Sequence, residues 1–562
     1  MTTRKVLFHE KLLMMGCVAA IACAEVQAAT FERTIQAPDG IGDVVALTNA
    51  LTELNEATDV YDYKTQVKIW LKPGTYDLSG VYMTSSHHLT IRAFQGGILA
   101  GLGADRGDTI LLGGGEDGGH GVLLSGGGGN FGYFTISNLT VTGGWAAGNG
   151  GGINGTHSTA YRYLIVSNNY AKGSSNGSGG GGCFKGCAYD CLFADNHCTE
   201  HWGGGFIVDG YSTRNETKGQ GAWNCVFIGN TAKDCGGGFA LNGGGQCEGC
   251  AFTNNTAATG SGVYFYNVDY TTYNGTKRVS CASNCIFSGN AGNGALYVNY
   301  SIAKKNVPVT DCEFVFNIGA HTVYCGDLAG CAIESNTNGT GVVGNSSLDR
   351  CVLKGNAVKN RYCTGVDYRE SGFPEMTNVN CRIESNCFLE EYGKILNGKS
   401  YVNCTILGNT MPNGGNYGYL SRDCVFHNCV LSGNKISSSK SCDVRTVGFG
   451  DAVVAVTMTN CVFSATDIAS GEIGADGTVS HEGLSGCCKI AAGNLKFENA
   501  ANGLYTPLRK SPLCDTGLRD AWILSAVGGV DLADNPRVMG DGIDIGAYEC
   551  QWAPVGMVIS VR

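Results

Sequence analysis

The segment Cys191-Leu-Phe-Ala-Asp-Asn196 shows the pattern that decides the fold of this chain. Its Cys, its large apolar third residue and its final Asn recur in one frame. The Cys positions are Cys191, Cys225, Cys250, Cys285, Cys312, Cys331, Cys351, Cys381, Cys404, Cys429 and Cys461. The last copy, Cys461/Phe463/Thr466, ends in Thr, and Tyr163/Ile165/Asn168 and Phe134/Ile136 look like earlier copies that lack the Cys.

The spacing inside this hexad indicates a short strand. Residues at i and i+2 point to the same side of a strand, so the Cys and the apolar residue face one core. We expect the Asn to end the strand, because Asn tolerates left-handed backbone. Copies lie 19 to 35 residues apart. A helical solenoid would keep its period, whereas a β-helix keeps its strands and varies its loops. The repeat therefore predicts an all-β, right-handed parallel β-helix with coils about 4.8 Å apart.

A second element precedes other apolar stretches. It appears as Gly-Gly-Gly-Phe at 203–206 and 236–239, as Gly260-Ser-Gly-Val-Tyr264, and as Gly294-Ala-Leu-Tyr297. Glycines before an apolar strand predict a tight corner where the chain turns to another face of the coil.

The N-terminal region predicts a helix followed by the first coil. Asp43 is placed to cap a helix whose Val44, Leu47, Leu51 and Leu54 share one face. Strands are then expected at 67–71 and 76–78, separated by a turn at 72–74. Such an end would cover the open edge of the first coil.

Composition and charge narrow the function classes. The chain has 562 residues, 87 Gly, 15% charged residues and a net charge of −10. That balance argues against nucleic acid, whose recognition requires clustered Lys and Arg, and against anionic membrane surfaces. Arg4, Lys5 and Lys11 precede an apolar run at 12–24 and small residues up to Ala28. This predicts a secretory signal peptide over 1–28. With no later apolar stretch long enough to span a bilayer, we expect a secreted or cell-surface protein.

The alternation of Phe-x-x-Asn with Gly-Gly-apolar segments resembles the repeats of chlamydial polymorphic outer-membrane proteins. More broadly, residues 130–466 resemble the pectin-lyase-like β-helix superfamily. The segment Asp531 to Glu549 resembles the terminal module of secreted bacterial β-helices, which implies that it closes the last coil. The expected divisions are a signal peptide at 1–28, a cap and first coil at 29–80, the β-helix at 81–505, and a capping module and tail at 506–562.

No catalytic set is evident in the sequence. Gly119-His120-Gly121 resembles part of the polygalacturonase signature, but the paired aspartates and the Arg-x-Lys segment of those enzymes are missing. Asp105-Arg106-Gly107-Asp108 is a compact acidic candidate for calcium, and it contains the integrin-binding tripeptide by chance. We expect no polysaccharide cleavage that depends on His120, Asp105 or Asp108.

We expect no metal or other cofactor. The terminal acids, which are Asp531, Asp534, Asp541, Asp544 and Glu549, are expected to bond loop amides and pair with Arg537. Cys183, Cys187 and Cys191, or Cys247 with Cys250, have tempting spacings, but no Cys/His set completes a zinc site.

Aromatic residues give a softer indication of sugar binding, because apolar sugar faces stack on rings. They are Tyr264, Phe265, Tyr266, Tyr270 and Tyr273 in one segment, with Trp145, Trp202 and Trp223 beside Gly-rich stretches. About half should point inward if the stretch is a strand.

Three hypotheses for function stay open. The first is a non-catalytic exported protein whose lateral face binds glycans or cell surfaces. The second is a polysaccharide lyase or glycoside hydrolase, which charged residues clustered on one outer face would favour. The third is an autotransporter passenger.

The cysteines give a separate prediction. Export favours disulfides, but stacked Cys side chains about 4.8 Å apart do not match disulfide geometry. We expect the eleven repeat cysteines to be free, inward-facing and inert. Any bridges should use Cys183, Cys187, Cys198, Cys235, Cys247 or Cys281.

Overall fold

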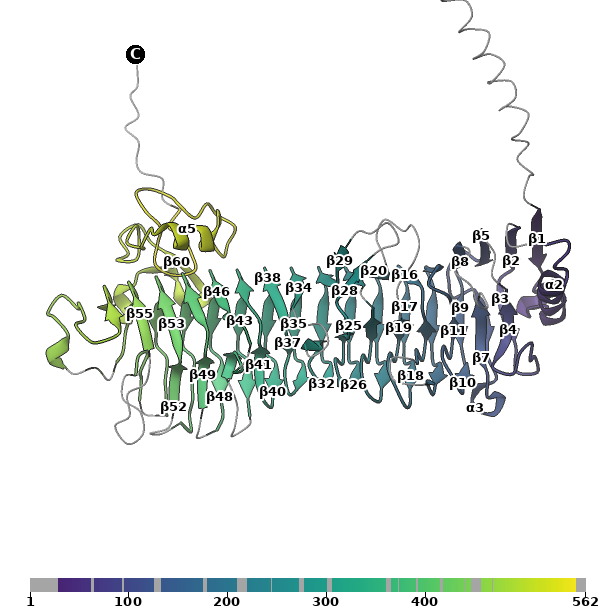
Figure 1. The fold of residues 1–562 in the computed structure, drawn as a ribbon, viewed down its shortest axis with the longest axis horizontal. Coiled ribbons are helices and arrows are strands. Elements are labelled where there is room, and N and C mark those ends of the chain that lie inside the picture. Colours follow the sequence, from purple (N-terminus) through teal and green to yellow (C-terminus); the bar gives the residue numbers. More distant parts are fainter. Residues whose placement is uncertain are drawn as a thin grey trace, which may run out of the picture.

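The computed structural model is an elongated parallel β-helix (Figure 1). It describes residues 29–551 except 62–64, 93–95, 126–132, 175–178, 210–219, 244, 272–276, 301–305, 360–364, 372, 391–392, 415–417, 439, 446–455, 467 and 469. The predicted signal peptide at 1–28 lies outside these residues. None of the helices in the described part is long and apolar enough to cross a membrane.

Four parallel sheets form the walls of the coil, and the chain visits them in the order A, B, D, C. Sheet A has 17 strands from β1 (Thr30–Ile35) to β57 (Leu484–Ser485), and sheet D has ten short strands from β10 (Trp145–Ala146) to β48 (Cys387–Phe388). These counts refer to the described residues. The predicted all-β, parallel β-helix class is confirmed.

Sheet B, which carries the hexad, has 16 strands in the described ranges. They are β3 (Gly74–Asp77), β6 (Thr109–Leu112), β9 (Thr140–Thr142), β13 (Ile165–Ser167), β17 (Leu192–Ala194), β21 (Val226–Ile228), β25 (Ala251–Thr253), β31 (Ile286–Ser288), β35 (Glu313–Val315), β39 (Ala332–Glu334), β43 (Val352–Lys354), β47 (Arg382–Glu384), β51 (Thr405–Leu407), β54 (Val430–Ser432), β56 (Val462–Phe463) and β58 (Cys488–Lys489).

Sheet C faces another side of the coil with 13 described strands. They are β4 (His87–Ile91), β7 (Gly121–Ser125), β11 (Ile153–Asn154), β15 (Cys183–Phe184), β19 (Phe206–Asp209), β23 (Phe239–Asn242), β27 (Val263–Phe265), β33 (Leu296–Val298), β37 (Val323–Tyr324), β41 (Gly341–Gly344), β45 (Gly365–Tyr368), β49 (Gly393–Asn397) and β52 (Gly418–Arg422).

The hexad stacks in register, as predicted. Phe193 pairs with Phe227, and Phe227 with Phe252. Their rings stack at 4.8 and 4.9 Å. All eleven repeat cysteines are buried, and no disulfide links them in the described part of the chain. Their inward orientation is confirmed, because the buried third residue of each hexad shares its side of the strand.

The residue that ends each strand is not the Asn, so that prediction was wrong. The left-handed backbone belongs to the residue before it, such as Asp195 (φ 51°) or Asn254 (φ 52°). A second left-handed residue precedes each repeat Cys, as Asp190 (φ 54°) precedes Cys191. Two such turns bracket each sheet B strand of the hexads from Cys191 to Cys429 and direct both the Cys and the Asn toward the interior.

The two earlier copies were also assigned wrongly. Val166, and not Ile165, pairs with Phe193. The copy therefore reads Leu164/Val166/Asn169, because Tyr163 takes the left-handed position with φ 52°. Phe134 and Ile136 lie in β8 (Tyr133–Ser137) of sheet A and belong to no hexad.

The Asn side chains form a continuous buried ladder. Each Nδ2 donates to Oδ1 of the Asn in the next coil, as from Asn196 to Asn230 at 3.0 Å, and also to a carbonyl of the preceding coil. The series is Asn169, Asn196, Asn230, Asn255, Asn290, Asn317, Asn336, Asn356, Asn386, Asn409 and Asn434. It ends on a buried carboxylate, since Asn434 Nδ2 donates to Asp443 Oδ1 at 2.7 Å. A broken step would leave buried polar atoms unpaired, at a cost of about 1–3 kcal/mol.

The predicted glycine corners lie between sheets D and C. A Cβ added to Gly204 would lie 2.4 Å from the carbonyl oxygen of Gly237 in the next coil. Backbones approach too closely here for any side chain, so glycine is required at this corner.

The N-terminal end forms as predicted. Helix α2 (Val44–Glu56) begins at Asp43, whose Oδ1 accepts from the Ala46 amide at 2.8 Å. Leu47, Leu51 and Leu54 are buried. The strands that follow are β2 (Gln66–Leu71) and β3.

The resemblance implied that the C-terminal module closes the last coil, and this expectation was wrong. The module lies along the side of the helix, where α5 (Ala521–Val527) and β60 (Leu504–Pro507) appear in yellow in Figure 1. Three successive coils hold it through Asn380, Asn403 and Asn428, whose Nδ2 atoms donate to carbonyls of Val527, Asp544 and Leu518. These asparagines are the left-handed residues of their coils, with side chains outside the core, so they are free to bind the module. The proposed domain boundaries stay predictions.

Candidate functional site

The outward-facing strand residues of sheet B between β13 and β31 are uncharged, although Asp195 is exposed at the turn after β17. Their side chains point away from the core in two rows, in register from coil to coil. The rows are Ile165, Leu192, Val226, Ala251 and Ile286, and Ser167, Ala194, Ile228, Thr253 and Ser288. Exposure of Val226, Ile228 and Ile286 is 40%, 38% and 46%. Exposed neighbouring apolar side chains on a soluble surface indicate an interaction site.

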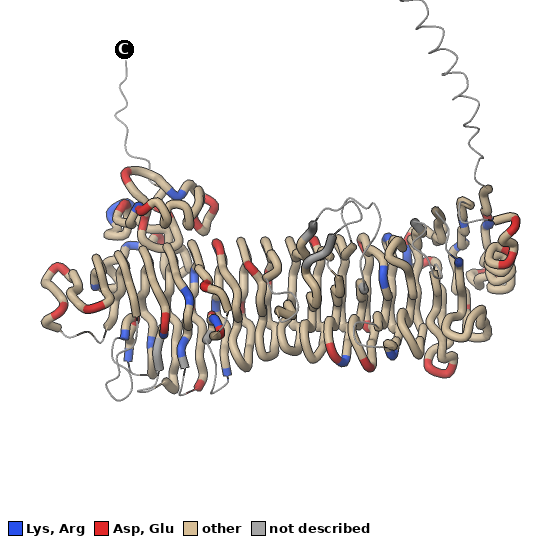
Figure 2. The backbone as a smooth tube through the Cα atoms, viewed as in Figure 1, with Lys and Arg blue, Asp and Glu red and all other residues tan. Residues whose placement is uncertain are grey.

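An aromatic row on sheet D adjoins this surface across the left-handed corner. Trp145, Tyr170 and His197 occupy equivalent positions in three coils, and Thr231 and Thr256 continue the row. Tyr170 is 37% exposed and stacks on His197 with ring centroids 4.6 Å apart. Burial lowers the pKa of His197, which keeps the ring neutral near pH 7. We call the two sheet B rows and this row the central face. None of its residues is charged, and the tube in Figure 2 is tan over most of the middle coils.

Charged side chains follow on the next coils of the same sheet. Glu334, Lys354 and Glu384 share one outward row, and Arg382 lies beside Glu384. Lys354 Nζ is 3.4 Å and Arg382 Nε 3.7 Å from Glu384 Oε1. We call these four residues the charged patch.

The terminal module borders the charged patch and supplies two phenols. Arg382 donates to the Tyr548 hydroxyl and to the Gly503 carbonyl, both at 2.9 Å. Burial, reinforced by nearby Glu384, raises the pKa of Tyr505 to about 12. The patch thus combines a cationic pair, a buried carboxylate and protonated phenols. Such groups can hold a uronate carboxylate and exchange protons with a sugar ring, although here they also bind the module.

Sequence reasoning missed the charged patch, yet the hexad contains the signal. Positions 2 and 4 of the hexad point outward, and they are uncharged in the copies that begin at Cys191, Cys225, Cys250 and Cys285. The three copies after Cys312 place Glu334, Lys354, and Arg382 with Glu384 at these positions.

The residues that the sequence analysis weighed and set aside as catalytic candidates make local structural contacts. His120 precedes β7 and packs against Tyr82, with ring centroids 4.6 Å apart. Asp105 and Asp108 accept from amides of their own loop at 2.9 Å. Arg106 donates to the Leu164 and Asp190 carbonyls of neighbouring coils. The structure does not bring these residues together with the charged patch.

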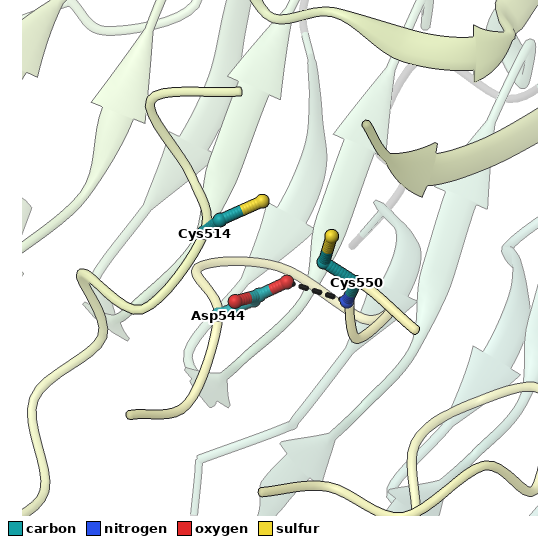
Figure 3. A group of neighbouring side chains, drawn as sticks. All are labelled: Cys514, Asp544 and Cys550. Atoms are coloured by element: carbon teal, nitrogen blue, oxygen red, sulfur yellow. Dashed lines mark hydrogen bonds between the residues drawn. The ribbon is translucent and has the colours of Figure 1, made fainter. Parts of the chain in front are cut away.

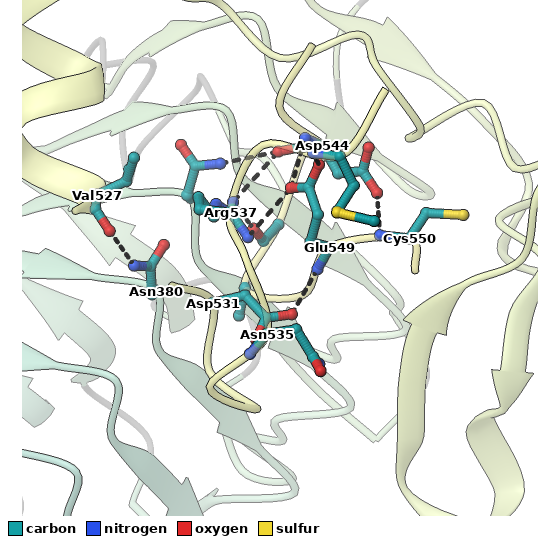
Figure 4. Close-up of polar contacts among 12 residues, drawn as sticks. Asn380, Val527, Asp531, Asn535, Arg537, Asp544, Glu549 and Cys550 are labelled. Carbon is teal, nitrogen blue, oxygen red and sulfur yellow. Dashed lines mark hydrogen bonds and ion pairs between the residues drawn. The ribbon is translucent and has the colours of Figure 1, made fainter. Parts of the chain in front are cut away.

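Three of the five terminal acids, Asp531, Asp544 and Glu549, accept hydrogen bonds from loop amides, as predicted (Figure 4). Asp531 accepts from the amides of Ala533, Asn535 and Glu549. Arg537 is fully buried, and its Nη1 lies 3.9 Å from Glu549 Oε2. Asp534 instead pairs with Arg350 of the β-helix at 2.6 Å.

Cysteines with metal-like spacing do not converge. Cys183, Cys187 and Cys191 are buried on three different sheets, and burial raises the pKa of the Cys183 thiol well above its ordinary value. Within the described residues, one group has ligand atoms close enough for a metal ion, namely Cys514, Asp544 and Cys550, within 4.8 Å of one another (Figure 3). The Asp544 carboxylate already accepts from the amides of Asp515 and Cys550, at 2.7 and 2.6 Å. This carboxylate is therefore part of the loop structure.

The aromatic segment around Tyr264 does not form a sugar-binding platform, because its rings belong to a stacked row. Tyr264, Tyr297 and Tyr324 follow one another on sheet C, with rings stacked at 6.1 and 4.8 Å. Each internal ring presents its edge outward, since its faces contact its neighbours, so these rings cannot stack on sugars. Phe265 is core, as period two requires. Trp223 stacks on Tyr189 at 4.9 Å, and the side chains of Tyr270 and Tyr273 lie outside the described set.

Comparison with known proteins supports no family assignment. No family model matches the chain. No curated protein matches it either. The solved structures that it resembles include the Azotobacter vinelandii mannuronan C-5 epimerase AlgE4 A-module, at 14% identity and a TM-score of 0.29, over 65% of this chain and 91% of that one. A mannuronic acid-specific family 6 polysaccharide lyase from human gut microbiota also has 14% identity and a TM-score of 0.29, over 82% and 92%.

A further similar structure is the catalytic domain of a GH87 α-1,3-glucanase, at 14% identity and a TM-score of 0.22, over 79% of this chain and 66% of that one. Similarity of the repeats to chlamydial polymorphic outer-membrane proteins stays a prediction. No family name is assigned to the chain.

Proposed function

We propose that this chain is an exported, non-catalytic β-helix that binds glycans through the central face. The observation that carries the proposal is the exposure of Val226, Ile228 and Ile286 on strands whose outward side chains carry no charge. Hydroxyl groups of Ser167, Thr253 and Ser288 alternate with these apolar side chains. Such a mixture suits a sugar chain, which offers apolar C–H faces and hydroxyl groups together.

The aromatic row on sheet D can orient a bound sugar chain. Trp145 is partly exposed at the edge of the central face, where its ring can lie against a sugar, and the exposed Tyr170 can offer its hydroxyl to a sugar hydroxyl group. Because the rows repeat at each coil, a polymer can meet similar groups on successive coils. A neutral polysaccharide fits the face better than an anionic one, which would need Lys or Arg.

A glycan array with the purified mature protein tests this proposal. Trp145→Ala and Tyr170→Ala should each weaken binding about tenfold, which corresponds to about 1.4 kcal/mol. Trp522→Ala is the matched control, because Trp522 is 49% exposed on α5, away from the central face. Binding that survives both substitutions, or that falls equally with Trp522→Ala, would exclude the central face.

A second candidate function is cleavage of an anionic polysaccharide at the charged patch. The observation that favours it is the row of Glu334, Lys354 and Glu384 next to Arg382 and Tyr505. In this case the pure protein should release unsaturated or reducing ends from a uronate polymer. Lys354→Gln should abolish the release, and Lys435→Gln, at an exposed position outside the patch, should not. No product from any uronate polymer would remove this candidate and leave the binding proposal intact.

A further inference from the structure

A polar cluster lies inside the β-helix where the chain passes from sheet C to sheet A. Asp367 lies on β45, and Lys399 directly precedes β50 (Ser400–Val402) in the next coil. Both side chains have 0% exposure, and Lys399 Nζ lies 2.5 Å from Asp367 Oδ1. Nζ also donates to the Ser346 carbonyl at 2.6 Å, which fixes its position. The cluster thus holds an amine against a carboxyl group with no access to solvent.

The second carboxyl oxygen has different partners. Asp367 Oδ2 accepts from the Tyr401 hydroxyl at 2.8 Å and from Asn378 Nδ2 at 2.5 Å. Asn378 is held in turn, because its Oδ1 accepts from the Leu348 amide at 3.1 Å. Burial raises the pKa of Tyr401 well above its ordinary value, so its hydroxyl stays a donor. One oxygen of Asp367 therefore faces the amine, and the other faces two neutral donors.

A buried ion pair adds little net free energy to the contact between two coils. Desolvation of two charges often outweighs their attraction, and apolar residues of similar size are often at least as stable. The neighbouring coils carry buried apolar residues at the position of Asp367, namely Val343 in one coil and Leu396 in the next. Conversion of the pair into a neutral amide would remove both charges and keep the link.

We propose that Lys399 and Asp367 condense to form an intramolecular isopeptide bond. A proton first passes from the ammonium group to Oδ1, which leaves a neutral amine and a carboxylic acid. Nζ then attacks Cγ, and the negative charge of the tetrahedral intermediate develops on Oδ2. Tyr401 and Asn378 donate to that oxygen, as donors do in an oxyanion hole.

The remaining step balances without another reactant. The Cγ–Oδ1 bond breaks, and Oδ1 takes a second proton from nitrogen and leaves as water. The sum is one ammonium group and one carboxylate converted to one amide and one water, with no oxidation or reduction. Fixed proximity lowers the barrier, since well-oriented intramolecular reactions reach effective concentrations of about 10⁵ M or more. The product is a covalent bond between coils, 32 residues apart in sequence.

Mass spectrometry of the unmodified full chain tests this directly. After reduction and alkylation of all thiols, the intact mass should be lower by one water molecule than the mass calculated for the sequence with every thiol alkylated. Trypsin should not cleave after the acylated Lys399. The digest should contain peptide 362–369, with Asp367, joined to peptide 395–422, with Lys399 uncut. A full sequence mass with cleavage at Lys399 would overturn the proposal, as would loss of ammonia with a bond to Asn378.

A pair of tyrosine variants tests the role of the donors. Tyr401→Phe removes one donor to Oδ2 and should slow the condensation about 100-fold, seen as a smaller cross-linked fraction in freshly purified protein. Tyr161→Phe is the control, because Tyr161 is also fully buried and donates to a carbonyl, that of Lys185 at 2.8 Å. Equal cross-linking in Tyr401→Phe and wild-type protein would overturn the assigned oxyanion role.

Discussion

Two regions of the outer face of sheet B carry similar residues but differ in what covers them. Toward the C-terminus, Leu407, Val430 and Val462 are buried beneath Leu513 and Ile545 of the terminal module. In the central face, Val226, Ile228 and Ile286 point outward in the same way, but no part of the described chain buries them to the same degree. An apolar outer row of a β-helix thus becomes buried only where a partner packs on it. In the C-terminal coils that partner is the terminal module of the same chain. Over the central face, we propose that the partner is a bound ligand.

The charged patch marks the border between these regions. Arg382 and Glu384 lie where the module ends, and Arg350 pairs with Asp534 at its rim. Polar rims around apolar centres are typical of protein interfaces. The comparison therefore makes the module resemble a permanently bound partner of the β-helix.

The largest expected effect comes from a charge placed beneath the module. Leu513→Asp puts a carboxylate into a fully buried apolar contact and should destabilise the docked module by about 3–5 kcal/mol. Ile286→Asp is the same kind of change on the central face, where the side chain is 46% exposed, and should cost about 0.5 kcal/mol or less. Urea unfolding with limited proteolysis measures both. Equal destabilisation by the two variants would remove the distinction between covered and bare regions.

The two regions should also respond to pH in opposite directions. Burial raises the pKa of Glu549 in the module from 4.5 to about 8. The folded module then holds a proton that the unfolded chain releases, so its stability should fall by up to about 4–5 kcal/mol as pH rises from about 4.5 to about 8. Burial lowers the pKa of His321 in the β-helix from 6.5 to about 4. The β-helix should therefore lose stability as pH falls from about 6.5 to about 4.

Proteolysis at several pH values, corrected for protease activity, separates these effects. Cleavage within 492–551 should increase toward alkaline pH, and cleavage of the β-helix should increase toward acid. Glu549→Gln keeps a neutral side chain at all pH values and should remove the alkaline effect alone. An alkaline effect that persists in Glu549→Gln would show that another group is responsible.

Thiol chemistry should distinguish the same two regions. Cys514 and Cys550 of the module have sulfur atoms within 4.8 Å, and we expect a disulfide between them after export. Its removal by Cys514→Ser should cost the module about 2–3 kcal/mol. The eleven repeat cysteines should stay reduced and unreactive until the chain is denatured. The bridges considered from the sequence are absent between Cys183, Cys198, Cys235, Cys247 and Cys281 in the structure.

Thiol counting with and without denaturant, followed by mass-spectrometric mapping, measures this. Disulfides between successive repeat cysteines would contradict our interpretation that stacking geometry keeps them apart.

The smallest expected effect concerns the central face alone. Ile228→Thr keeps the branched side chain and the outward position, so unfolding free energy should change by about 0.5 kcal/mol or less. Binding of a glycan identified on the array should weaken about twofold to threefold, as less apolar surface is buried. Thr253→Val is the reciprocal change in the adjacent coil. Unchanged binding in both variants would place the ligand elsewhere.

The fold was predictable because one constraint repeats. Each hexad must place Cys and an apolar residue on one side of a strand, and stacking multiplies this signal over many coils. The predictions that were wrong concern the backbone conformation of single residues. The left-handed residue before the repeat Asn is Asp195 in one coil, Asn254 in another and Phe316 in a third, so no residue type marks it. Because the Asn is constant and the residue before it varies, the sequence pattern alone assigns the turn to the Asn.

The candidate site was predictable only in part. Outward positions of the hexad can be read from its period, which would have shown both the uncharged copies and those carrying Lys354 and Glu384. Position of the terminal module could not be read, because it depends on contacts such as that of Asn380 with Val527, 147 residues away. The Lys399–Asp367 pair was hidden for the same reason, since loops of variable length separate its members.

The asparagine ladder has an electrical consequence. Every side-chain amide in it, from Asn169 to Asn434, points one N–H toward the C-terminal coils and its Oδ1 toward the N-terminal coils, so the amide dipoles add along the axis as peptide dipoles do in an α-helix. The positive end of that row meets Asp443, a buried carboxylate, where the series of asparagines stops. Opposite charges at the ends of aligned dipoles are stabilising. The asparagine row is therefore polar along the axis, and it stops where the buried carboxylate of Asp443 accepts the last amide N–H.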